Sequence, residues 1–200
     1  MKNQKKGNKG FTLIETLIVM TITSILAIGA TQLLSSTIKV QSYTLANQSM
    51  IDQTSFMIET MARDIRLAVK DYKNECGIKD ESGNPGNYVV ENGGTSIKFM
   101  TQRSQCVQYS FVNDPDFPRL MVSKFSTSTA GGGWPTEDKK IYVLPLNSQE
   151  FKITNLRFEV RNNAVLQQPR VTVFLSLESR LFKEANIKLQ TTVSLRNENK

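Results

Sequence analysis

The chain has 200 residues, enough for one domain or at most two, and a formal net charge of +7. Four lysines stand in its first ten residues without an acid, and no later stretch is a basic run, so the charge gives little support to nucleic-acid binding. The sequence has no histidine, which excludes His-dependent triads, His metal sites and a His-based pH switch.

The basic segment 1–10 is followed by a mostly apolar segment at residues 11–34. About 20 apolar residues cross a bilayer as a helix, because each residue advances about 1.5 Å and the hydrocarbon layer is about 30 Å thick. Basic residues before such a span stay in the cytoplasm. We therefore expect a single-pass membrane protein whose C-terminal part lies outside the cytoplasm.

The helical pattern continues beyond the apolar segment, since no proline occurs before Pro85. An apolar stripe at spacings of three and four residues predicts that one face of the helix is buried. Its members are Ile51, Thr54, Ile58, Met61, Ile65, Ala68 and Tyr72. The sequence thus predicts one long helix over residues 11–72, with its transmembrane part at about 11–34 and its second half packed on a domain.

Residues 73–200 have the composition of a β-rich globular domain outside the cytoplasm, with glycine- and asparagine-rich turns at 83–87 and 91–94. The strand-like runs are SIKFMTQ, CVQYSFV, RLMVSKF, KIYVLPL, LRFEV, RVTVFLSLE and IKLQTTVSLR. In the LRFEV region the alternation slips by one residue, which predicts a bulge or turn at Thr154–Asn155. We expect an α+β fold in which the helix stripe covers one antiparallel sheet.

Glu15 places a carboxylate one turn inside the apolar segment. A secretory signal peptide removed after Ala30, or an ordinary signal anchor, would leave this acid without a role other than capping. Capping is a real alternative, because Thr12 and Glu15 have the spacing of a Thr-x-x-Glu capping box and an acid in the first turn meets the positive end of the helix dipole.

A cut between Gly10 and Phe11 would give Glu15 a partner. Phe11 would gain a positively charged amine four residues before Glu15, on the same helix face. An acid inside the membrane costs about 2.5–3.5 kcal/mol at mid-bilayer and normally has a partner. That amine could belong to the same chain or to a neighbouring chain, and pairing between chains would set the axial register of parallel helices.

The segment KGFTLIE at residues 9–15, with the basic leader before it and the apolar helix after it, resembles the N-terminus of the type IV pilin and pseudopilin superfamily. The resemblance implies that a prepilin peptidase cuts after Gly10 and N-methylates Phe11, and that Glu15 pairs with the amine of a neighbouring subunit. It also implies a pilin-like fold, with a long N-terminal helix packed on an antiparallel sheet.

Major pilins commonly carry a proline in the second half of the apolar span, whereas residues 26–36 of this chain have none. In this missing proline, in its long β-rich portion and in its ending at residues 191–197, the chain is more similar to the larger minor pilins and to the J-type minor pseudopilins of type II secretion. The resemblance implies an initiating or tip role, first in the inner membrane and then in a filament. The implied partners are other pilin subunits, the peptidase and an inner-membrane assembly platform.

Cys76 and Cys106 both lie outside the cytoplasm in this topology, where a disulfide is expected to form; two free buried thiols are the alternative. Two cysteines without a histidine do not make a zinc site. The oxygens of Asp114 and Asp116 are of the kind that binds calcium, although an Asx-type turn explains the segment 113–116 as well. Trp134, in the glycine-rich loop 129–135, is expected either to contact a partner or to fold back onto the sheet.

The sequence shows no enzyme site, and we expect no catalytic residues, cofactor or resident metal. The run Ser36–Lys39 matches Ser-x-x-Lys, but it falls at the membrane exit of the helix, where a solvated turn explains it. The sequence thus predicts a structural subunit of a pilus or pseudopilus. The alternative is a membrane-anchored or secreted binding module with no role in a filament.

Overall fold

The structure is a computed structural model that describes residues 10–80, 82–126, 142–161, 168–182 and 185–195. The chain forms two compact units, residues 1–45 and 46–200. Within the described residues, the first unit contains the N-terminal part of the helix α1 (Leu13–Arg66), and the second contains the rest of α1 and the strands.

Helix α1 is shorter at both ends than the predicted range 11–72. It begins at Leu13 because Thr12 caps it, and it ends at Arg66, where the backbone turns through a hydrogen bond from Leu67 N–H to the Asp64 carbonyl. The apolar stripe predicted too late an end for the helix. Ala68 is buried, as predicted, but it lies in strand β1 (Ala68–Val69) and not in the helix. Tyr72 lies beyond that strand and is 74% exposed.

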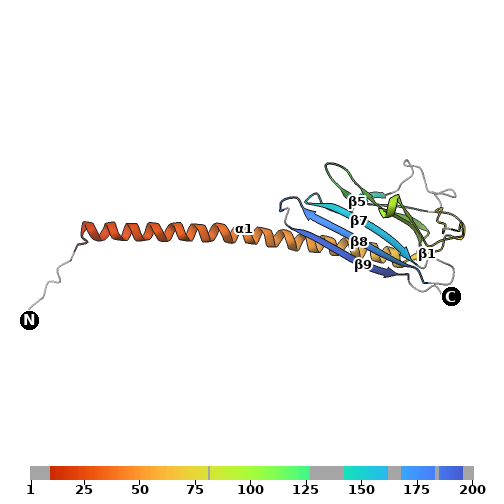
Figure 1. Ribbon diagram of the computed structural model, residues 1–200, viewed down its shortest axis with the longest axis horizontal. Helices are drawn as coiled ribbons and strands as arrows, with labels where there is room; N and C mark the ends of the chain where they lie inside the picture. The colour runs from red at the N-terminus through yellow and green to blue at the C-terminus, as the bar shows by residue number, and fades with distance from the viewer. Residues whose placement is uncertain (1–9, 81, 127–141, 162–167, 183–184, 196–200) are drawn as a thin grey trace, which may run out of the picture. The chain divides into compact units, whose positions relative to one another are not determined.

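The buried face of α1 in the second unit is displaced by one residue from the predicted stripe at its start. Ile51 is 53% exposed, and the neighbouring Met50 is fully buried in its place. Both choices keep spacings of three and four, so periodicity alone cannot separate them. The buried residues of α1 are Met50, Thr54, Met57, Met61, Ala62 and Ile65. In Figure 1 this part of α1 runs alongside the strands that it covers.

The strands form two antiparallel sheets, where the sequence predicted one. The larger sheet has the order β1-β3-β4-β5-β6, and β2 also pairs with β3. Its strands after β1 are β2 (Tyr88–Glu91), β3 (Ser96–Thr101), β4 (Gln105–Val112), β5 (Arg119–Ser126) and β6 (Tyr142–Pro145). The smaller sheet has the order β7-β8-β9, from β7 (Phe151–Arg161), β8 (Arg170–Ser179) and β9 (Asn186–Ser194).

The register shift predicted at Thr154–Asn155 is present. Ile153 pairs with Leu177 and Asn155 with Ser176, so β7 carries an extra residue at this point. Both flanking side chains, Ile153 and Leu156, are thereby buried. The alternating run of β8 is buried as predicted, with Val171, Val173, Leu175 and Leu177 at most 1% exposed.

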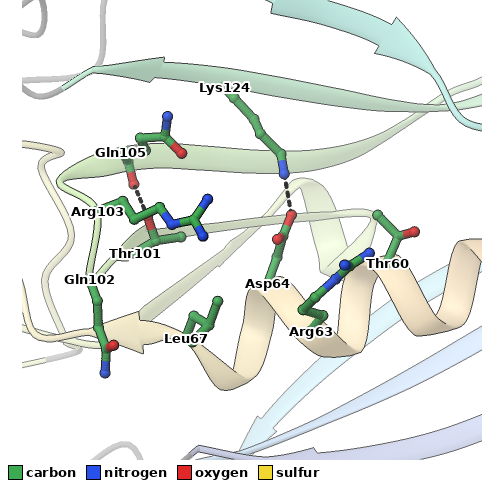
Figure 2. Close-up of a pocket in the computed structure, with 9 residues that line it drawn as sticks. All are labelled: Thr60, Arg63, Asp64, Leu67, Thr101, Gln102, Arg103, Gln105 and Lys124. Atoms are coloured by element: carbon green, nitrogen blue, oxygen red, sulfur yellow. Dashed lines mark hydrogen bonds and ion pairs between the residues drawn. The ribbon is translucent and has the colours of Figure 1, made fainter.

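Polar contacts fix the end of α1 to the larger sheet. The carboxylate of Asp64 accepts a hydrogen bond of 2.7 Å from the Tyr109 hydroxyl. It also forms an ion pair with Lys124, which Figure 2 shows. At the next residue of the helix, the Tyr88 hydroxyl donates to the Ile65 carbonyl at 2.8 Å. These bonds satisfy groups that the apolar core would otherwise leave unpaired, so they specify how this part of α1 lies on the sheet.

Candidate functional site

The N-terminus of α1 is closed by Thr12. The Thr12 hydroxyl accepts a hydrogen bond of 3.3 Å from the backbone N–H of Glu15, and the Thr12 carbonyl accepts one of 3.2 Å from Thr16 N–H. Thr12 is therefore the N-cap, and Glu15 is the third helical residue. This is one half of the capping box that the sequence predicted as an alternative role for Glu15.

The other half of the capping box is not formed. The Glu15 side chain is exposed, and within residues 10–80 its carboxylate makes no hydrogen bond or ion pair. The carboxylate stands in the first turn, where the free N–H groups of the helix favour a negative charge. Capping by Thr12 thus leaves the Glu15 carboxylate available to a group outside the first turn.

The helix around Glu15 exposes large apolar side chains on all of its faces. Every large apolar side chain from Phe11 to Leu34 is between 49% and 82% exposed. An 18-residue window of α1 has a mean hydropathy of 2.0 and no buried residue, so by length and composition this helix is able to cross a membrane. The hydroxyls of Thr16, Thr21, Thr23, Ser24 and Thr31 donate to backbone carbonyls of the preceding turn at 2.7–3.0 Å. They are therefore satisfied without water.

Gly10 is not required by its surroundings. A Cβ atom built on Gly10 would meet no atom within 4 Å, and its backbone does not adopt the left-handed conformation that favours glycine. Neither packing nor backbone conformation therefore explains a glycine here. The cleavage that the sequence predicts between Gly10 and Phe11 remains a prediction.

Comparison with known proteins gives a match at the N-terminus. The family model of the prokaryotic N-terminal methylation motif matches residues 5–31. No curated protein matches the chain. No solved structure matches it either.

The chain therefore carries a type IV pilin-like prepilin signal on an apolar helix of the length needed for membrane anchoring. The motif indicates processing by prepilin peptidase and assembly with other pilin subunits. The α+β architecture, in which a long N-terminal helix packs against antiparallel sheets, is pilin-like as predicted. The roles of Gly10, Phe11 and Glu15 remain predictions.

The predicted disulfide between Cys76 and Cys106 is present and joins the segment after β1 to strand β4. Beside it lies Asp71, which is 1% exposed. Its carboxylate accepts three backbone N–H groups, from Glu75 at 2.7 Å, Cys76 at 2.9 Å and Ile78 at 3.1 Å. The disulfide and this carboxylate together hold a segment that has almost no secondary structure of its own.

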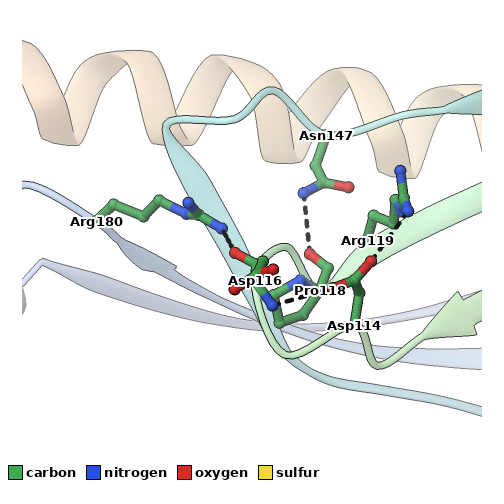
Figure 3. A network of polar contacts seen from close by, with 6 residues as sticks. All are labelled: Asp114, Asp116, Pro118, Arg119, Asn147 and Arg180. Atoms are coloured by element: carbon green, nitrogen blue, oxygen red, sulfur yellow. Dashed lines mark hydrogen bonds and ion pairs between the residues drawn. The ribbon is translucent and has the colours of Figure 1, made fainter.

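The segment 113–116 forms the Asx-type turn that the sequence offered as one of two interpretations. The Asp114 carboxylate accepts the N–H of Asp116 at 3.0 Å and pairs with the Arg119 guanidinium at 3.2 Å (Figure 3). The Asp116 N–H, and to a lesser degree Arg119, lowers the pKa of the Asp114 carboxyl. Arg180 donates to the backbone carbonyl of Asp116. The Asp114 oxygens that the sequence offered to calcium are thus engaged by the protein itself.

Two other predicted features have different outcomes. The Ser36 hydroxyl donates to the Leu33 carbonyl at 3.2 Å within its own helix, which fits the expected helical turn. Trp134 and its loop at 129–135 lie outside the described residues.

Sequence reasoning missed Asp71 and the pairing of Asp64 with Lys124. Asp64 and Lys124 are separated by 60 positions in the chain, so no local pattern links them. Asp71 follows β1 in a stretch with no periodicity, and nothing in its neighbours indicates a buried acid.

Proposed function

We propose that this protein is a structural subunit of a type IV pilus or of a type II secretion pseudopilus, and not an enzyme. Prepilin peptidase cuts it between Gly10 and Phe11 and methylates the new amine of Phe11. The subunit then assembles through its apolar helix, with the inner membrane as its first location and the filament as its second. Its partners are other pilin-like subunits, the peptidase and an inner-membrane assembly platform.

The observation that carries this proposal is the Glu15 carboxylate, which has no partner within residues 10–80 and lies on a mostly apolar helix surface. In lipid such an acid is costly unless a positive group neutralises it. Cleavage after Gly10 creates that group one helical turn away, at Phe11. When the amine of one chain pairs with Glu15 of the next, the helices of parallel subunits are held in one axial register.

A minor or initiating position is proposed within that class. The apolar span lacks a proline at residues 26–36, and α1 is continuous from Leu13 to Arg66. A helix without such a break has no built-in point for local unwinding in a packed filament. We place this subunit where the filament begins or ends, and not in its bulk.

The test is whether filament association depends on processing. The full chain is expressed in its native cell, with and without the prepilin peptidase, and sheared filaments are separated from membranes. We expect the protein in the filament fraction only when the peptidase is present, and in the membrane fraction in both cases. Absence from filaments in both strains, with normal membrane insertion, would instead favour an anchored binding module.

A further inference from the structure

A polar pocket of about 410 Å³ lies between the last turns of α1 and the turn that joins β3 to β4. Figure 2 shows its walls: Arg63 and Asp64 come from the helix, Arg103 from the turn, and Lys124 from β5. Thr60, Gln102 and Gln105 add neutral polar groups to its lining. All of these residues belong to the second compact unit.

The charges in this pocket are unequally paired. Asp64 forms an ion pair with Lys124 and also accepts the Tyr109 hydroxyl, so these two opposite charges neutralise each other. Arg63 and Arg103 are exposed, and within the described residues neither forms an ion pair. Two positive charges therefore remain at the pocket, one from the helix and one from the β3–β4 turn, and neither forms an ion pair within the described residues.

The chemistry of the lining favours a carboxylate. A guanidinium presents a planar pair of N–H donors that matches the two oxygens of a carboxylate, and side-chain amides and hydroxyls supply further donors. Asp64 and Lys124 form a neutral pair, but the Asp64 carboxylate lines the pocket and repels an anion that comes into contact with it. This repulsion weighs more heavily against a doubly charged phosphate than against a singly charged carboxylate.

The exposure of the two arginines bears on whether the bound carboxylate belongs to a small molecule or to a protein. An exposed ion pair contributes about 0–1 kcal/mol, so two of them would hold a free small carboxylate only weakly. A carboxylate that belongs to a longer acidic segment gains from repeated charge and from contacts outside the pocket.

We propose that this pocket binds an acidic side chain of a protein partner, held by Arg63 and Arg103. Neither Glu15 nor the methylation motif takes part, so the inference does not rest on the proposed function.

The test measures binding of a short acidic peptide to the full chain in uncharged detergent micelles at low ionic strength. The probe is a blocked tetraglutamate peptide, and the neutral tetraglutamine peptide of the same length is its reference. The binding variant is Arg63→Gln/Arg103→Gln. The matched control is Arg66→Gln/Arg161→Gln, which removes the same net charge from two exposed arginines outside the pocket. Thermal unfolding of both double variants checks that the fold is retained.

We expect tetraglutamate to bind the wild-type chain, and the Arg63→Gln/Arg103→Gln variant to bind it about tenfold more weakly, as loss of two exposed pairs allows. The control variant should change the dissociation constant by less than about twofold. Equal weakening in both variants would show non-specific attraction and overturn the site. Binding of tetraglutamine as tight as that of tetraglutamate would overturn it as well. Inorganic phosphate that competes at concentrations below those of acetate would overturn the assignment to a carboxylate.

Discussion

The hydroxyl of Thr12 accepts the backbone N–H of Glu15 at 3.3 Å, while the Glu15 carboxylate makes no bond within residues 10–80. Thr12 thus caps the start of α1, and Glu15 supplies a negative charge in its first turn. Helix capping and subunit pairing can therefore be separated by mutation.

Glu15→Val should leave membrane insertion intact and strongly reduce recovery in sheared filaments, because it removes the proposed partner of the Phe11 amine without removing the cap. Thr12→Ala should do the reverse: it costs the helix about 1 kcal/mol of capping energy and leaves filament recovery near that of the wild type. Quantitative immunoblots of membrane and filament fractions check both. Undiminished recovery of Glu15→Val would count against the role in register.

Asp71→Ala should destabilise the second compact unit by about 3 kcal/mol. The variant removes the charged acceptor of three backbone N–H groups, and two of these groups belong to the buried residues Cys76 and Ile78. Asp71→Asn keeps an acceptor oxygen but loses the charge, so its effect should be smaller. Denaturant unfolding of the full chain in micelles, with the disulfide intact, gives both values. The exposed Asp52→Ala, on α1, serves as the control and should stay within about 0.5 kcal/mol of the wild type. A similar loss at both sites would refute the role assigned to Asp71.

Tyr109 makes stability depend on pH in the alkaline range. Burial, and secondarily the negative charge of Asp64, raises the pKa of the Tyr109 hydroxyl far above its ordinary value. The unfolded chain releases this proton above about pH 10, whereas the folded chain keeps it. The folded state then binds more protons than the unfolded state, so its stability must fall as the pH rises.

Tyr109→Phe removes this contribution. Above about pH 10 the free energy of unfolding of the wild type should fall more steeply than that of Tyr109→Phe, by about 1.4 kcal/mol per pH unit. Below that pH the two curves should run parallel, with the variant less stable by about 2 kcal/mol, because it loses a hydrogen bond to the charged Asp64 carboxylate. Denaturant unfolding at a series of pH values supplies the comparison. Curves that stay parallel above pH 10 would show that Tyr109 is not the group responsible.

Much of the fold could be predicted from the sequence because its signals are local. The alternation of β8 and the slip in β7 follow from side-chain direction along one strand, and both are confirmed. The predicted end of α1 was wrong because a buried Ala68 fits a helix and a strand equally well, and it lies in a strand. The division into two sheets depends on pairing between distant segments, and alternation within a strand does not specify which strand lies beside it.

The candidate site divides in the same way. Gly10, Phe11 and Glu15 lie within six consecutive residues, so a short motif was enough to find them. The pocket between Arg63 and Arg103 is formed by residues from α1, the β3–β4 turn and β5. The pocket forms only when these elements fold together, so no pattern within a single segment of the sequence predicts it.

The central claim is that Glu15 is tolerated in the apolar segment because cleavage creates an amine beside it. Mass spectrometry of the N-terminal peptide, from protein purified out of its native cell, tests this most directly. Gly10→Val is the control, since the structure has room for a side chain at this position and only processing should suffer. The account predicts a wild-type chain that begins with N-methylated Phe11 and a variant that keeps Met1. A wild-type chain that retains residues 1–10, or that begins at Thr31, would contradict it.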